Sequence, residues 1–171
     1  MESQNVSVGS FAKNYGLVLG LILVLITVIM YVTGMQLEGI QWPMYLYYII
    51  FPAIIIYAIS QYKKSNANLL SLRQAIKIGL LVAVISALVF AVYSLIFNYI
   101  IDPEFQGLAM EAVRDKLLEN PNLTEEIVDK QMDMMEKFSS PLIANAAFIA
   151  FSSIFGLIYS LIGGLVMKKE A

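Results

Sequence analysis

The stretch GLVLGLILVLITVIMYVTGM, residues 16–35, contains no charged side chain. It lies inside a longer uncharged stretch, residues 14–37, between Lys13 and Glu38. A helix of roughly 20 apolar residues crosses the hydrocarbon layer of a bilayer, which is about 30 Å thick. A helix also pairs its backbone N–H and C=O groups within the segment, as lipid requires. Residues 16–35 are therefore predicted to form a membrane-spanning helix.

Three further uncharged stretches follow, at residues 39–62, 78–101 and 138–167. They predict spans at residues 43–62, 76–101 and 142–167. The chain is 59% hydrophobic and 14% charged, whereas soluble domains are about 45–50% apolar and about 25% charged. The predicted fold is all-α, a single integral membrane domain over residues 1–171 with four transmembrane helices.

The composition also excludes several kinds of chemistry. The chain has no cysteine and no histidine, which excludes a disulfide framework, a zinc site of the usual Cys/His kind and reactions that need a thiolate or an imidazole. No nucleophile–base pair or phosphate-binding glycine loop can be assembled from the sequence. A net charge of −2 and a pI near 5.1 argue against nucleic acid as a partner. We therefore expect a non-enzymatic protein without a cofactor or a metal.

Positive charge is concentrated on one side of the predicted spans. Seven of the 11 Lys and Arg residues lie in the N-terminal segment, the loop after the second span and the C-terminal segment, with only two acids, Glu2 and Glu170. The opposite side holds the other 11 acids and only four bases: Arg114, Lys116, Lys130 and Lys137. The positive-inside rule then predicts that both termini are cytoplasmic and that residues 102–141 are extracytoplasmic.

Residues 102–141 are predicted to form an amphipathic helical hairpin between the third and fourth spans. Asp102-Pro103 is typical of a helix start, and Asn120-Pro121 ends that helix because proline disfavours helical geometry in the preceding residue. Asn122 with Glu125 three positions later has the capping-box spacing that predicts the start of the second helix. The apolar stripes at helical spacing are Phe105, Leu108, Ala109, Ala112, Val113 and Leu117 on the first helix, and Ile127, Val128, Met132, Met135 and Phe138 on the second.

These stripes can pack on each other and on the ends of the spans, or they can contact lipid or a partner protein. Met132, Met135 and Phe138 are the candidate contact residues, because methionine is soft and adaptable. A row of carboxylates follows another face of the second helix: Glu125, Asp129, Asp133 and Glu136. We interpret this row as a solvated face, since it lacks the loop carbonyls of a dedicated Ca²⁺ or Mg²⁺ site.

The four uncharged stretches lack the Asp, Glu, Lys, Arg and His side chains that usually carry protons or ions through a membrane protein. Asn98 is the candidate for a specific helix–helix or ligand contact, with Ser152 and Ser160 as further polar candidates. Small residues at four-residue spacing let two helix backbones approach closely. The candidate close-packing positions, within one bundle or between protomers, are Gly16, Gly20, Gly156 and Gly164.

Three segments carry a resemblance to a known family: KNYGLVLGLILVLITVIMYVTG (13–34), YSLIFNYIIDPEF (93–105) and EEIVDKQMDMMEKFSSP (125–141). Together they resemble the bacterial four-span membrane proteins grouped as domain of unknown function family 4199. The resemblance implies a bacterial inner-membrane location and an association with a polyprenyl-phosphate glycosyltransferase system. It supplies no catalytic residue.

Two functional hypotheses follow. The first is a non-enzymatic accessory or anchoring subunit for another membrane-associated protein, which contacts membrane lipids and either a membrane-protein partner or a second copy of the chain. The second is a small oligomeric carrier or binder of a lipid or another uncharged hydrophobic molecule. The second hypothesis rests on Asn98, on the serines of the fourth span and on the kink expected at Pro52.

Overall fold

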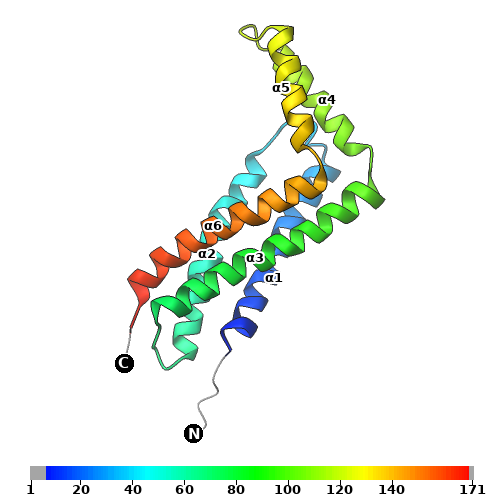
Figure 1. The fold of residues 1–171 in the computed structure, drawn as a ribbon. Coiled ribbons are helices and arrows are strands. Elements are labelled where there is room, and N and C mark those ends of the chain that lie inside the picture. The colour runs from blue at the N-terminus through cyan, green and yellow to red at the C-terminus, as the bar shows by residue number, and fades with distance from the viewer. Residues whose placement is uncertain (1–6, 170–171) are drawn as a thin grey trace.

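The computed structural model describes residues 7–169, and Figure 1 shows their arrangement. Glu2 and Glu170, which entered the charge comparison, lie outside the described residues. The helices are α1 (Val8–Val32), α2 (Trp42–Ser65), α3 (Leu72–Ile96), the π-helical turn η1 (Phe97–Ile101), α4 (Phe105–Leu118), α5 (Glu125–Phe138) and α6 (Pro141–Met167). Within residues 7–169, four helical segments are long and apolar enough to cross a membrane: α1, α2, α3 with η1, and α6. The predicted all-helical, four-span fold is confirmed.

Helix α1 begins earlier than predicted, at Val8 rather than near residue 16. Its first turns pack on the end of α2, where Ala12 is fully buried and the rings of Phe11 and Tyr62 meet edge-on with centroids 5.7 Å apart. This contact extends the helix through Lys13 and beyond the uncharged stretch. At the other end, Gly34 adopts a φ of +76°, so the helix stops at Val32 rather than at residue 35.

The third span changes its helical geometry where it leaves the bundle. It starts at a capping box in which Ser71 Oγ accepts from the Gln74 N–H and the Gln74 side chain accepts from the Ser71 N–H. It continues as an α-helix to Ile96 and then widens into η1, where the Asp102 N–H donates to Phe97 O at 2.9 Å. Single π-turns are frequent at functional sites, and this one leads directly into the hairpin.

Helix α3 is central to the bundle and packs most extensively on α6 and α1. Small residues make its contact with α6 close. A methyl group built on Gly156 would collide with Ala83 Cβ, and one built on Gly79 would collide with Ser160 Cβ. We call this contact between Gly79, Ala83, Gly156 and Ser160 the α3–α6 seam.

The remaining predicted close-packing glycines also face α3. Methyl groups built on them would lie 2.7 Å from Ile85 Cβ (Gly16), 2.7 Å from Val89 Cβ (Gly20) and 2.8 Å from Ala75 Cβ (Gly164). Together with Gly156, all four predicted glycines therefore make close contacts inside one chain, on the two sides of α3.

Helix α2 completes the bundle with larger side chains. Tyr47, Phe51, Ile55 and Ile59 are all buried. Pro52 lies inside the helix, which remains α-helical from Trp42 to Ser65. Contacts of α2 with its neighbours are accordingly less extensive than those along α3.

The hairpin of α4 and α5 projects from the end of the bundle opposite to the start of α1 and the end of α6 (Figure 1). Helix α4 ends at Leu118, before Asn120-Pro121, as predicted. The predicted start of the second helix at an Asn122 cap is wrong, because α5 begins at Glu125 with Thr124 in the N-cap position. Asn122 instead closes the turn, where its N–H donates to Asn120 Oδ1 at 3.0 Å.

Replacing Gly156 by alanine is expected to destabilise the bundle by about 1–3 kcal/mol, because the added methyl overpacks the α3–α6 seam. Gly163→Ala is the matched control. The nearest atom there is the flexible Met167 Cε at 3.4 Å, so alanine gains about 0.5–1 kcal/mol of helix preference without a clash. Thermal unfolding in one detergent measures both variants. A Gly156→Ala protein as stable as the parent would contradict the close contact.

Candidate functional site

The hairpin joins the bundle through a cluster of aromatic rings around η1. Tyr31, near the end of α1, packs edge-on against Phe97 and Phe105 with centroid distances of 4.8 and 5.2 Å. Phe97 also lies 5.5 Å from Phe105 and 5.9 Å from Tyr93. Edge-on pairs favour particular ring orientations in addition to burying apolar area. These four rings, with Asp102, connect α1, the third span and α4, and we call them the joint.

Asp102 supplies the polar contacts of the joint. The Tyr31 hydroxyl donates to Asp102 Oδ2 at 2.9 Å. The second carboxylate oxygen, Oδ1, accepts from the Phe105 N–H at 3.1 Å. Asp102 therefore satisfies a free N–H in the first turn of α4, the capping function expected from its sequence position. Pro103 lies in the preceding turn rather than at the first helical position.

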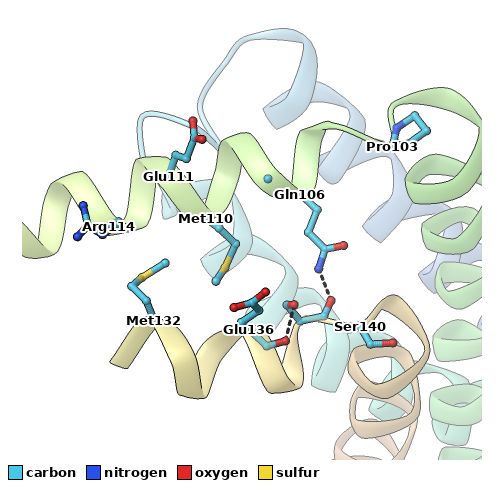
Figure 2. A pocket seen from close by; sticks show the side chains of 10 residues that line it. Pro103, Gln106, Met110, Glu111, Arg114, Met132, Glu136 and Ser140 are labelled. Carbon is cyan, nitrogen blue, oxygen red and sulfur yellow. Dashed lines mark hydrogen bonds between the residues drawn. The ribbon is translucent and has the colours of Figure 1, made fainter. Parts of the chain in front are cut away.

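Two more side chains attach the hairpin away from the joint. Gln106 Nε2 donates to Ser139 O, which links the base of α4 to the end of α5 (Figure 2). Lys116 Nζ donates to Glu38 O in the loop between α1 and α2. Gly39 beside it has a φ of +66°, and a Cβ there would collide with Lys116 Nζ. Polar contacts beyond the joint thus hold a hairpin in which α4 has no fully buried residue.

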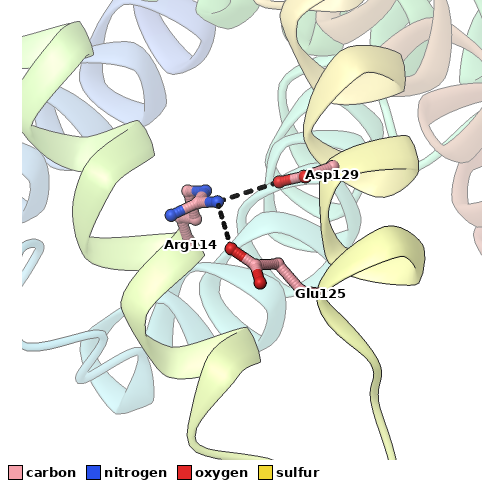
Figure 3. Close-up of polar contacts among 3 residues, drawn as sticks. All are labelled: Arg114, Glu125 and Asp129. Carbon is pink, nitrogen blue, oxygen red and sulfur yellow. Dashed lines mark hydrogen bonds and ion pairs between the residues drawn. The ribbon is translucent and has the colours of Figure 1, made fainter.

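An arginine connects the two helices of the hairpin. Arg114 Nη2 on α4 lies 2.9 Å from Asp129 Oδ1 and 3.9 Å from Glu125 Oε1 on α5 (Figure 3). The hydrogen bond and the charge of Asp129 raise the pKa of Arg114 above its ordinary value. The guanidinium therefore stays charged throughout the accessible pH range. Two members of the predicted acidic row, Glu125 and Asp129, are in this way directed toward α4.

A cleft of about 600 Å³ lies between α4 and α5 at the base of the hairpin. Figure 2 shows Met110 and Met132 facing each other across it, with Glu136 beside them. Glu111 also borders the cleft, but its carboxylate points away from α5. The cleft thus combines a deformable apolar floor with the carboxylate of Glu136 and with Arg114, whose guanidinium is paired with Asp129. Its lining residues include no facing carboxylate pair suited to acid–base chemistry.

The structure divides the predicted Met-rich stripe between two surfaces. Met132 is partly buried in the cleft, whereas Met135 and Phe138 are 41% and 65% exposed on the outside of α5. Met134, at 62% exposed, belongs to the same outer surface. Val128 is fully buried and is the residue that closes the hairpin core. The stripe is therefore only partly used for packing within the hairpin.

Asn145, rather than the predicted Asn98, makes a side-chain hydrogen bond between α6 and α3. Asn98 Nδ2 donates to Ser94 O at 2.8 Å within its own helix. Asn145 Nδ2, on α6, donates to Ser94 Oγ at 3.2 Å and so links α6 to α3. A sequence signal was available, because Asn145 extends the spacing of Ser152, Gly156 and Ser160 by seven residues, on the face that meets α3.

The other two predicted polar residues of α6 have different surroundings. Ser160 donates to Leu157 O at 3.0 Å and packs against Gly79. Ser152 is buried beside a groove of about 410 Å³ between α2 and α6. The rings of Tyr47, Tyr48, Phe51, Phe148, Phe151, Phe155 and Tyr159 form the rest of this groove.

Several residues of the hairpin and its joint were not identified from the sequence. Tyr31 and Asp102 are 71 positions apart, and no local pattern connects them. Lys116 donates to a backbone carbonyl. Because every residue carries this group, the sequence does not indicate which residue accepts the bond. Arg114 had a usable signal, since it is one of two bases in its helix and the next helix carries a row of acids.

The fold consists of four apolar helices and a hairpin that is attached to them by polar contacts. These features define a multi-pass membrane protein of the helical class. The chain belongs to the family described as "Protein of unknown function (DUF4199)", whose model matches residues 14–169. This match covers most of α1, the other three spans and the hairpin, and it confirms the family inferred by resemblance. No curated protein matches the chain, and no solved structure does.

Removing the Tyr31 hydroxyl is expected to loosen the hairpin, because Tyr31→Phe keeps the ring but loses the bond to Asp102. Since the chain has no cysteine, spin labels can be placed on Glu119→Cys and Gln41→Cys. The distance distribution between them should widen in Tyr31→Phe. Tyr45→Phe, the same change at an exposed tyrosine of α2, should leave it unchanged. Identical distributions in all three proteins would show that the bond does not position the hairpin.

Proposed function

We propose that this protein is a non-enzymatic accessory subunit that binds another membrane-associated protein through its hairpin. The observation that carries the proposal is the free-standing position of α4 and α5 beyond the bundle (Figure 1). Among the described residues, α4 and α5 contact each other more than they contact any other helix, and this contact is small beside those within the bundle. Because the hairpin contributes little to the packed core, we infer that it binds another molecule.

The cleft between α4 and α5 is the surface that we assign to the partner. Methionine side chains adapt to differently shaped apolar groups, and Met110 and Met132 face the cleft from opposite helices (Figure 2). An amphipathic helix or an extended segment can place apolar anchors in such a groove. The carboxylate of Glu136 at the same place favours a segment that carries a basic residue.

The proposed location is the bacterial inner membrane, with both termini cytoplasmic and the hairpin outside. The unequal distribution of Lys and Arg supports this orientation. The family membership is consistent with a bacterial source, and the resemblance makes a polyprenyl-phosphate glycosyltransferase system the first partner to test. Membrane lipids surround the four spans in this proposal.

Met132→Asp is expected to reduce recovery of the partner at least about tenfold in affinity purification from native membranes, because a carboxylate would be buried against the partner's apolar anchor. Glu136→Lys should weaken recovery as well, with no change in the apolar floor. Leu118→Asp, on an exposed position of the same hairpin, is the matched control and should behave like the parent. All variants should reach the membrane in equal amounts. Undiminished recovery with both cleft variants would contradict the proposal.

The groove between α2 and α6 supports a second candidate function, the binding of a lipid or another uncharged hydrophobic molecule. Its aromatic lining with one serine suits a flat or unsaturated apolar ligand. Asn98 gives this candidate no support, because it does not line the groove and its Nδ2 donates to Ser94 O within its own helix. Lipid mass spectrometry of the same purification distinguishes the two functions: one enriched small molecule without a protein partner favours the groove.

A further inference from the structure

The outside of α5, close to the point where the chain enters α6, is apolar and uncovered. Met134, Met135 and Phe138 are 62%, 41% and 65% exposed. With Met110, Gln131 and Ser139 they line a shallow hollow of about 560 Å³, which adjoins the cleft at Met110 and Ser139 but does not include Met132. Exposing a contiguous group of large apolar side chains to water is unfavourable.

This surface continues into the lipid-facing side of the bundle. Two serines, Ser139 and Ser140, separate Phe138 from α6, and the first turn of α6 exposes Leu142 (62%) and Ile143 (48%). Helix α6 has 27 residues and is therefore about 40 Å long, longer than the hydrocarbon layer of about 30 Å. Its first turn must reach the edge of that layer, which places Phe138 within the polar headgroup region.

A free cation accompanies the ring. Lys137 directly precedes Phe138, and among residues 7–169 it forms no ion pair within 4.0 Å. A lysine beside an aromatic residue is typical of the membrane–water interface, where the amine reaches phosphate and the ring meets the acyl chains. The hairpin as a whole carries more acids than bases, so general electrostatic attraction to an anionic surface does not explain the contact.

We infer that Met134, Met135, Lys137 and Phe138 form a lipid anchor: the outer face of α5 rests in the headgroup region of the bilayer. The occupant of this face is the phospholipid surface itself, and the attraction comes from apolar burial. The anchor attaches the end of the hairpin nearest α6 to the bilayer surface, in addition to the polar contacts that join the hairpin to the bundle. It leaves the cleft between α4 and α5 open. The inference does not depend on the proposed partner.

Tryptophan fluorescence of the full-length protein in phosphatidylcholine vesicles tests the anchor. The chain has a single tryptophan, Trp42, so Trp42→Phe provides a silent background for Phe138→Trp. Leu142→Trp in the lipid-facing first turn of α6 is the reference for contact. Leu118→Trp at the far end of α4 is the reference for water. The quencher is phosphatidylcholine brominated near the glycerol end of its acyl chains.

The tryptophan at position 138 should be quenched at least about half as strongly as that at position 142, with a blue-shifted emission, and should keep this quenching at high salt. The tryptophan at position 118 should be quenched little. Because these vesicles contain no other protein, a partner cannot produce the signal. Quenching at 138 as weak as at 118, or quenching that disappears at high salt, would overturn the anchor and leave the proposed function untouched.

Discussion

The close approach of α3 to both α1 and α6 is the contact on which the rest of the structure depends. Lipid tails are as apolar as the helix surfaces, so burial from water does not drive one span against another. Van der Waals contact must do so, and it is strongest where small residues let backbones come together. Gly79 and Ala83 against Gly156 and Ser160 meet this need on one side of α3, as Gly16 and Gly20 do on the other.

This packing also determines where the hairpin emerges. The seam aligns α3 with α6, which brings Asn145 to Ser94 near the ends from which α4 and α5 depart. Beyond that point the helical geometry changes to η1, and the joint then turns the chain away from the bundle. The segment YSLIFNYIIDPEF, residues 93–105, which carries part of the family resemblance, supplies most of the joint: Tyr93, Phe97, Asp102 and Phe105.

The hairpin and the bundle are held by different forces. Apolar packing stabilises the spans, whereas the hairpin relies on one aromatic joint and a few polar contacts, such as Gln106 to Ser139 and Lys116 to Glu38. An arm attached in this way can adjust to a partner without disturbing the membrane bundle. On α5, Met132 lines the cleft, whereas Met134 and Met135 are exposed on the other surface. In the two proposals above, the first side binds a partner and the second contacts the bilayer surface.

The spans, the two-helix hairpin and the small-residue positions were predictable because each depends on local composition or spacing. The early start of α1 was not, since it requires the contact of Phe11 with Tyr62, which lies on another helix. The cap of α5 was misassigned because Asn122 and Thr124 are both good N-cap residues, and the turn geometry decides between them. The joint was missed because Tyr31 and Asp102 meet only after α1 and α3 have packed.

The central claim is that four spans place the hairpin on the membrane face opposite to the loop between α2 and α3. Single cysteines at Ser65 and Asn120, introduced into the naturally cysteine-free chain, test it with a membrane-impermeant maleimide on intact bacterial cells whose outer layers admit the reagent. The account predicts that the cysteine at position 120 reacts at once and that the one at position 65 reacts only after the membrane is permeabilised. Reaction of both from the outside would contradict it, whereas reaction of position 65 alone would keep the two segments on opposite faces and reverse the proposed orientation.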